Sequence, residues 1–395
     1  MSMSTMDRLD GVAARAGGAG PWDASAIDPL VELVRTPSVS GAERGAVECF
    51  VRWARALGFE TAIDDVGNGL AWRSTVASRS ARPVQLMLLG HIDTVPGEIP
   101  VRIEDGVLHG RGSVDAKGPL AAMLVAAARA DLPPDTTVIV AAAVGEETPR
   151  SVGARHLAAR FLPDACIVGE PSGADGVTLG YKGRLVAHAV TTAECAHTAG
   201  PAGSSSDRLF AWWSRVVALA AARNEGVAIE FDRLQCSIRS AASHNDGLAD
   251  SAQLTAGFRL PPALDPHDLA DRLRALADGA ITLAFEGHET AHRTTRNDAV
   301  VRALSTAIRA GGATPRPKLK TGTADLNVVA PVWRCPIAAY GPGDSALDHT
   351  PHERISLDEY LTSIRVLTHA IPTLAAELSA ERSGPANTTP LSLTP

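Results

Sequence analysis

Three short apolar runs constrain the fold of this chain more than any other feature of its sequence. They cover residues 84–89, 137–144 and 165–168, and each is followed at once by glycine and then by histidine or glutamate. Uninterrupted apolar runs of this length are typical of strands that are covered on both faces. Stretches rich in alanine at 117–130 and 151–161 lie between them and predict helices. The order strand, helix, strand, helix, strand predicts an α/β sheet with helices on both faces.

Polar side chains stand where these predicted strands end. His91 follows the first run, Glu146 and Glu147 follow the second, and Glu170 follows the third. Ligands of open α/β sheets gather at the carboxyl ends of the strands, so we expect these side chains to meet at one edge. Asp115 lies in the glycine-rich loop just before the first of the two predicted helices. Histidine nitrogen and carboxylate oxygen donors suit a pair of divalent ions of the zinc or cobalt type.

From residue 182 onward the pattern changes. Alternating patterns at 185–191 and 252–260 predict strands, and 207–223 and 267–276 predict helices, which together are typical of a small α+β layer. The remaining predicted elements are helices at 27–34, 43–57, 298–310 and 357–374 and short strands at 328–332 and 337–340.

These patterns predict two domains, which is also the expectation for a chain of 395 residues. We expect a catalytic, metal-binding domain at 21–181 and 291–382, with a lid or dimerisation domain inserted at 182–290. The ends at 1–20 and 383–395 are small and polar, and we expect them to be disordered.

The composition excludes several classes of partner. With 37 basic and 44 acidic residues the net charge is −7, which gives no reason to expect nucleic acid or an anionic membrane as partner. No stretch has the ~20 apolar residues of a membrane span and no apolar signal segment opens the sequence, so we expect a cytoplasmic location. The five cysteines form no Cys-x-x-Cys pair, which argues against a thiolate metal site or a disulfide framework.

The adjacent glutamates predict a division of roles. Successive side chains on an extended segment point to opposite sides, so one glutamate can face the metal ions while the other faces the substrate. We interpret Glu147 as the ligand and Glu146 as the general base. Asp93, two residues after His91, is suited to accept a hydrogen bond from the second ring nitrogen of that histidine. A loop-capping role is the alternative for Asp93.

Each of these signals is weak by itself. A lone histidine after a strand is more often structural than metal-binding, and paired glutamates are usually solvated surface. Their occurrence together, in this order and at these strand ends, is what favours a two-metal hydrolase.

With these motifs the chain resembles the M20 family of metallopeptidases and deacylases, over about residues 26–376. The resemblance implies a zinc-peptidase-like mixed sheet with an inserted α+β domain. It further implies that His91 and Glu170 hold one metal ion, that Glu147 and a C-terminal histidine hold the other, and that Asp115 bridges both.

The C-terminal ligand is identified from the motif at 348–353. The family places a glutamate four residues after this histidine, and Glu353 has that spacing from His349. His352 lacks the spacing and is rejected.

The resemblance also implies residues that bind the substrate. His197, in the inserted segment, resembles the histidine that reaches the active site of a neighbouring subunit and holds the developing oxyanion, so we expect a homodimer. Arg259 resembles the arginine that pairs with a substrate carboxylate, for which a planar fork is well suited. The turn at Gly322 and Thr323 is expected to offer backbone N–H groups to the same end, and Asn245 is a weaker candidate.

Within the family, the segments 112–120, 182–184 and 320–329 resemble the hydrolases that release lysine or ornithine from an amino-group carrier protein. The basic run at 316–320 agrees with an acidic carrier, although basic runs are often only solvated. An N-acetylornithine deacetylase, a succinyl-diaminopimelate desuccinylase or a dipeptidase is the alternative, acting on a small amino-acid derivative. A catalytically inactive binding protein of the same fold is the alternative outside the enzymes.

Overall fold

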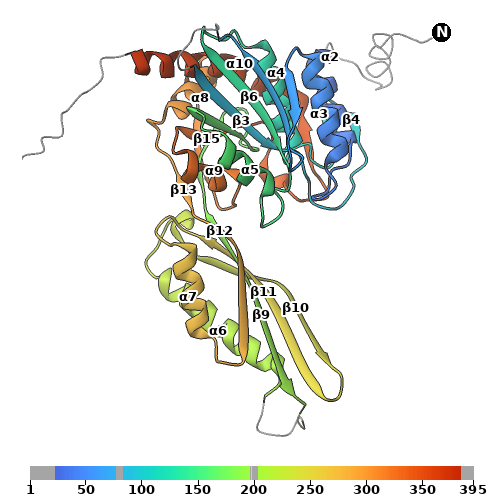
Figure 1. The fold of residues 1–395 in the computed structure, drawn as a ribbon, viewed down its shortest axis with the longest axis vertical. Coiled ribbons are helices and arrows are strands. Elements are labelled where there is room, and N and C mark those ends of the chain that lie inside the picture. The colour runs from blue at the N-terminus through green and yellow to red at the C-terminus, as the bar shows by residue number, and fades with distance from the viewer. Residues whose placement is uncertain (1–22, 77–82, 196, 198–202, 384–395) are drawn as a thin grey trace, which may run out of the picture.

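A computed structural model describes residues 23–76, 83–195, 197 and 203–383, and Figure 1 shows the fold. The first predicted disordered segment, 1–20, lies outside the described residues, as does 384–395 of the second. Residue 383 is the last residue of a long C-terminal helix.

The larger sheet of the described chain has nine strands and mixed pairing. Strands β3, β6 and β7 are parallel neighbours at its centre, whereas β1, β2 and β13 pair antiparallel with their neighbours. The order is β1 (Glu60–Ile63), β2 (Gly69–Ser74), β6 (Thr136–Ala143), β3 (Val84–His91), β7 (Ala165–Gly169), β15 (Ile337–Ala339), β8 (Gly176–Tyr181) and β13 (His292–Arg293), with β14 (Arg316–Lys320) paired to β8. This arrangement confirms the predicted mixed α/β sheet.

Helices cover both faces of this sheet, which explains why the sequence of its central strands is almost entirely apolar. In β3, Leu86 and Leu88 belong to one buried cluster and Met87 and Leu89 to another, because successive side chains face opposite sides. The first face is covered by α2 (Ala24–Arg35), α3 (Arg44–Ala56), α4 (Lys117–Arg129), α8 (Ala299–Ala310) and α10 (Leu357–Ser383), and the second by α5 (Val152–Arg160) and α9 (Asp325–Trp333).

A second, four-stranded antiparallel sheet projects from this body (Figure 1). Its order is β10 (Gln235–Asn245), β11 (Ala249–Leu260), β9 (Gly183–Glu194) and β12 (Ile281–Glu289). Helices α6 (Ser205–Arg223) and α7 (Pro266–Leu276) pack on it, and Trp212, Phe258 and Leu273 are buried between them. A short 3-10 helix, η1 (Glu230–Asp232), precedes β10.

A small three-stranded sheet joins two loops that are distant in sequence. Strand β5 (Val107–His109) pairs with β4 (Arg102–Glu104) on one side and with β16 (Arg354–Ser356) on the other. Because Asp115 follows β5 and His349 precedes β16, this pairing sets the distance between their loops. A second 3-10 helix, η2 (Ser345–Leu347), lies just before His349.

One predicted element is wrong. Residues 328–332 were expected to form a strand, but they lie inside helix α9. Five apolar residues in a row carry no period that separates a buried strand from a buried helix. The helix is favoured locally because the Asn327 side chain accepts a hydrogen bond from the backbone N–H of Ala324, at 3.1 Å, and so caps its N-terminus.

Among the described residues, the helices are too short or too polar to cross a membrane.

Candidate metal centre and substrate cavity

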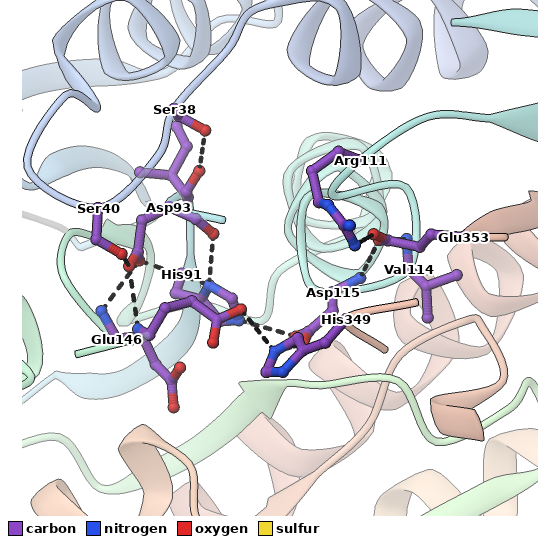
Figure 2. A network of polar contacts seen from close by, with 12 residues as sticks. Ser38, Ser40, His91, Asp93, Arg111, Val114, Asp115, Glu146, His349 and Glu353 are labelled. Carbon is purple, nitrogen blue, oxygen red and sulfur yellow. Dashed lines mark hydrogen bonds and ion pairs between the residues drawn. The ribbon is translucent and has the colours of Figure 1, made fainter. Parts of the chain in front are cut away.

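Asp115 lies between two histidines that come from different parts of the chain. His91 Nε2 is 3.1 Å from Asp115 Oδ1, and His349 Nε2 is 3.1 Å from Asp115 Oδ2. Figure 2 shows this arrangement, with His91 at the end of β3 and His349 in the loop before β16. Each carboxylate oxygen therefore faces a different imidazole, which is the geometry that a bridging ligand of two ions requires.

The glutamates complete two groups of donors. Glu147 Oε1 is 3.0 Å from His349 Nε2, and Asp115, Glu147 and His349 offer ligand atoms that all lie within 4.8 Å of one another. His91, Glu146 and Glu147 form a second such group. Glu170, which is only 7% exposed, lines a cavity together with Asp115, Glu147 and His349. The structure thus brings all five predicted ligands together.

The ring of His91 turns its Nε2 atom towards Asp115. His91 Nδ1 lies 3.0 Å from the backbone carbonyl oxygen of Asp93, and since a carbonyl only accepts, Nδ1 carries the proton. Nε2 faces the Asp115 carboxylate, which also only accepts, so Nε2 donates to it here and would present a lone pair to a metal ion only in the neutral ring. The Asp93 carboxylate, which we expected to accept this proton, is farther away at 3.6 Å.

Instead, the Asp93 carboxylate holds the glutamate pair in place. Its two oxygens accept hydrogen bonds from the backbone N–H groups of Glu146 and Glu147, each at 3.0 Å, and one of them also accepts from the Ser40 hydroxyl at 2.7 Å. Asp93 thereby fixes the backbone from which both glutamate side chains project.

Glu353 supports Asp115 in a similar way. One oxygen of its buried carboxylate accepts hydrogen bonds from the backbone N–H groups of Val114 and Asp115, at 3.0 and 3.1 Å. The other accepts from Arg111 at 2.8 Å (Figure 2). Sequence spacing used Glu353 only to identify His349, and the structure shows that it positions the loop of Asp115.

His349 itself has an unusual backbone. Its φ of 60° lies in the left-handed region, which a residue with a Cβ rarely adopts. Such conformations persist where the surrounding structure imposes them, and they cluster at functional sites.

The carboxylates of this cluster repel one another in a buried setting. Burial raises the pKa of Glu146 well above its ordinary value, and burial together with the charge of Asp115 raises the pKa of Glu170 to about 7. Burial opposes ionisation of Asp115 too, but hydrogen bonds from His349 and His91 outweigh it and lower its pKa. Hydrogen bonds to Asp115 and Glu147 raise the pKa of His349 to about 10.

This excess of buried negative charge indicates that the cluster suits cations. Carboxylates that cannot all ionise together are stabilised as anions by a positive ion placed among them. The mixture of imidazole nitrogen and carboxylate oxygen fits divalent ions of the zinc and cobalt type.

The cluster opens into a cavity of about 400 Å³ that also contains predicted substrate-binding residues. Arg259 Nη1 donates a hydrogen bond to Thr323 Oγ1 at 2.6 Å, and Thr323 in turn donates to the Lys182 carbonyl at 2.9 Å. Burial, with the charge of Arg184 nearby, lowers the pKa of Arg259 to about 10. The residues that line the cavity are Asp115, Glu146, Glu147, Glu170, Tyr181, Arg259, Leu319, Lys320, Thr321, Gly322, Thr323, Ser345, Asp348 and His349.

Two predicted site residues lie elsewhere in the same chain. Asn245 ends β10 and accepts a hydrogen bond from the Gly247 backbone N–H at 2.9 Å, at the outer tip of the four-stranded sheet. His197 follows the end of β9 at the same tip, and its neighbours 196 and 198–202 lie outside the described residues. At about 3.3 Å per residue, β9 spans roughly 35–40 Å between this tip and the cavity.

Two ionisable residues of the cavity were not among the predicted site residues. Asp348 precedes His349, and burial with the nearby charge of Asp115 raises its pKa to about 8. Lys320 places its ammonium 5.7 Å from the centre of the Tyr181 ring. Both lie in motifs that the sequence had already singled out, but adjacency to a ligand does not show which way a side chain points.

A mixed α/β sheet that brings two histidines and several carboxylates together around Asp115 is the arrangement of a metal-dependent hydrolase. More specifically, the chain belongs to the M20 peptidases, because the sequence model of peptidase family M20/M25/M40 matches residues 87–373.

Relatives in sequence cover most of the chain. A LysW-lysine hydrolase of Deinococcus radiodurans is 45% identical over 364 residues, which are 89% of this chain and 98% of the relative. A LysW-lysine/LysW-ornithine hydrolase of Saccharolobus islandicus is 29% identical over 297 residues, 73% of this chain and 81% of the relative.

Solved structures show the same fold at low identity. An M20 metallo-carboxypeptidase of Sulfolobus solfataricus superimposes with a TM-score of 0.72 at 17% identity, covering 89% of this chain and 99% of that one. The YXEP protein of Bacillus subtilis, described as a dinuclear metal binding peptidase of the M20 family, has a TM-score of 0.65 at 14% identity and covers 90% of this chain and 98% of its own.

Proposed function

We propose that the chain releases lysine or ornithine by hydrolysing the amide bond to an amino-group carrier protein. The observation that supports this proposal most directly is the position of Asp115. Its two carboxylate oxygens face His91 and His349, and it lines the cavity that Arg259 also lines. The names of the two sequence relatives supply the substrate class.

In this proposal two divalent ions, zinc or cobalt, bind at the cluster. His91 and Glu170 hold one, Glu147 and His349 hold the other, and Asp115 holds both. When bound, such ions lower the pKa of water and polarise an amide carbonyl. Asp93 and Glu353 keep the donors in place through the backbone hydrogen bonds described above.

Glu146 serves as the general base. Its carboxylate accepts a proton from the water molecule whose oxygen attacks the amide carbon, and it passes that proton to the amine as the carbon–nitrogen bond breaks. Asp93 fixes the backbone N–H of Glu146, which limits where this carboxylate can move. Arg259, together with the Gly322–Thr323 turn, holds the substrate carboxylate.

A second copy of the chain completes the site. His197 and Asn245 lie at the outer tip of the four-stranded sheet, too far from the cavity of their own chain. Strand β10 is an edge strand with residues 237–245 exposed, and Phe210 of the adjacent helix α6 is 51% exposed. An exposed edge strand of this length is a template for pairing with another chain. We therefore propose a homodimer in which 182–290 carries the contacts and His197 binds the oxyanion of its partner's substrate.

We propose a different carrier surface from the basic run at 316–320 that the sequence suggested. Arg316 pairs with Asp175 at 2.5 Å, and Lys318 Nζ donates to the Ser172 carbonyl at 2.5 Å, so two residues of the basic run at 316–320 already have partners. Beside β14, however, Arg296 and Arg309 are exposed around a cavity of about 320 Å³. We propose that an acidic carrier docks on this surface of α8 and β14.

The test compares two substrates of one enzyme. Hydrolysis of carrier-linked lysine should fall when both Arg296 and Arg309 are replaced by alanine, and the loss should shrink at high salt, because such contacts are screened. Hydrolysis of N-acetyl-lysine should not change in the same variant. A wild-type preference for N-acetylornithine, a succinylated diamine or a dipeptide would instead favour the simple deacylase or dipeptidase alternative.

A further inference from the structure

Asp348 lines the cavity without a role in the proposed metal centre or in proton transfer. Its Oδ1 atom is buried and accepts no hydrogen bond from any described residue. Buried carboxylate oxygens are normally hydrogen-bonded, so an unpartnered one needs an explanation. Its position on the cavity wall shows where a partner would come from.

The cations of the cavity do not supply that partner. Arg259 donates to Thr323, and the Lys320 ammonium lies near the face of the Tyr181 ring. The backbone of Asp348 is held by its own hydrogen bond to the Ser345 carbonyl, at 3.4 Å, in the 3-10 helix before His349. The backbone that carries this carboxylate is therefore held on the cavity wall.

We propose that Asp348 binds the side-chain ammonium of the released amino acid and so selects lysine or ornithine over apolar amino acids. An ammonium group offers three N–H donors, and a hydrogen bond between an ammonium and a carboxylate is stronger than one between neutral groups. Arg259 and Asp348 then bind opposite charges of one ligand, its carboxylate and its side-chain ammonium. This inference rests on the proposed function, since it concerns the amino acid that the reaction releases.

Binding of free amino acids tests the inference without depending on the acyl group. The metal-loaded enzyme is titrated calorimetrically with L-lysine, L-ornithine and L-norleucine, the last of which has a methyl group in place of the ammonium-bearing end. Wild type should bind lysine at least about tenfold more tightly than norleucine. Asp348→Asn should weaken lysine binding about tenfold to hundredfold and leave norleucine binding within about threefold.

The matched control is Asp344→Asn in the same loop. Asp344 is exposed, does not line the cavity, and accepts a hydrogen bond from the Ala346 backbone N–H at 3.0 Å. The Asp344→Asn variant should bind lysine as tightly as the wild type does. Equal loss of lysine and norleucine binding in Asp348→Asn, or loss of metal, would assign Asp348 to positioning His349 and overturn the inference.

Lengthening the side chain at position 348 gives a second, independent measurement. Asp348→Glu keeps the charge and extends it by one methylene group, while ornithine is one methylene group shorter than lysine. The variant should therefore shift preference from lysine towards ornithine. An unchanged ratio of lysine to ornithine affinity would contradict direct contact with the ammonium.

The two proposals fail in different ways. If the wild type binds lysine and norleucine equally but still releases lysine from the carrier, the inference about Asp348 is wrong and the proposed function stands. If the wild type releases no amino acid from either the carrier or an N-acyl derivative, the proposed function fails whatever Asp348 does.

Discussion

The two ends of the four-stranded sheet have different relations to the active site. At the inner end, Arg259 of β11 lines the cavity and donates a hydrogen bond to Thr323, in the loop before α9. At the outer end, β10 and β11 turn at 245–249 and Asn245 contacts only its own neighbourhood. The inner end therefore contributes to the active site of its own chain. The outer end can contribute only to the active site of another chain.

This difference shows what a motif does and does not reveal. A motif identifies the kind of chemistry that a residue performs, but strand length decides whether it can reach the rest of the site. Arg259 and His197 were both predicted from motifs, His197 with the expectation that it serves a neighbouring subunit, and the structure places Arg259 on the cavity and His197 beyond the far end of β9.

The largest expected effect concerns the inner site. Asp115→Ala should lose both metal ions, because this residue faces both histidines. Activity should fall at least about 10³-fold. Replacing a residue that only hydrogen-bonds to a metal ligand typically costs about 10–100-fold. Metal analysis of the purified protein after loading with zinc measures this. Asp271→Ala, an exposed carboxylate on α7, is the control. Retention of both ions would contradict the bridging role.

A smaller loss separates proton transfer from metal binding. Glu146→Gln should keep both ions and lower kcat about 10²–10⁴-fold, because the amide cannot accept the proton of water. Metal content and kcat are measured on one preparation. If this variant loses an ion and Glu147→Gln does not, the roles of the two glutamates are reversed.

The comparison of the two sheet ends is tested directly by mixing subunits. His197→Ala alone should lower kcat about 10²–10³-fold, as loss of an oxyanion donor does. Equal amounts of this variant and Glu146→Gln, exchanged into dimers, should recover about one quarter of wild-type activity, since half the dimers are hybrids and each has one intact site. No recovery after verified exchange would mean that His197 acts in its own chain or not at all.

The smallest expected effect is at the inner end of the sheet. Arg259→Lys keeps the charge but removes the planar fork, so KM should rise about tenfold while kcat and metal content change little. Steady-state kinetics with N-acetyl-lysine measures this. A large fall in kcat at unchanged KM would place Arg259 in the chemical step rather than in binding the carboxylate.

Much of the larger domain could be predicted because its strands are buried on both faces. The runs that became β3, β6 and β7 are apolar except for Gln85 and Thr137, and the polar residues that follow them meet at one edge, as the sequence predicted. Residues 328–332 were mistaken for a strand because an apolar run in a core has no distinguishing period.

Other features could not be predicted for a different physical reason. Strand β10 escaped notice because residues 237–245 are exposed and show no apolar alternation. Both carboxylate oxygens of Asp93 and one of Glu353 accept hydrogen bonds from backbone N–H groups, and such contacts depend on loop geometry rather than on residue type. The roles of the predicted ligands, of Glu146 and of His197 stay predictions until they are measured.

The hydrogen bond between the Asp115 backbone and Glu353 has a consequence for biosynthesis. The two residues are 238 positions apart, and a ribosome adds about 5–20 residues per second, so roughly 10–50 seconds pass between their synthesis. Throughout that interval the Asp115 loop lacks its acceptor, and for all but the last four residues of it His349 has not been synthesised. Because His349 is one of the proposed ligands, the proposed metal site can be completed only when translation is nearly over.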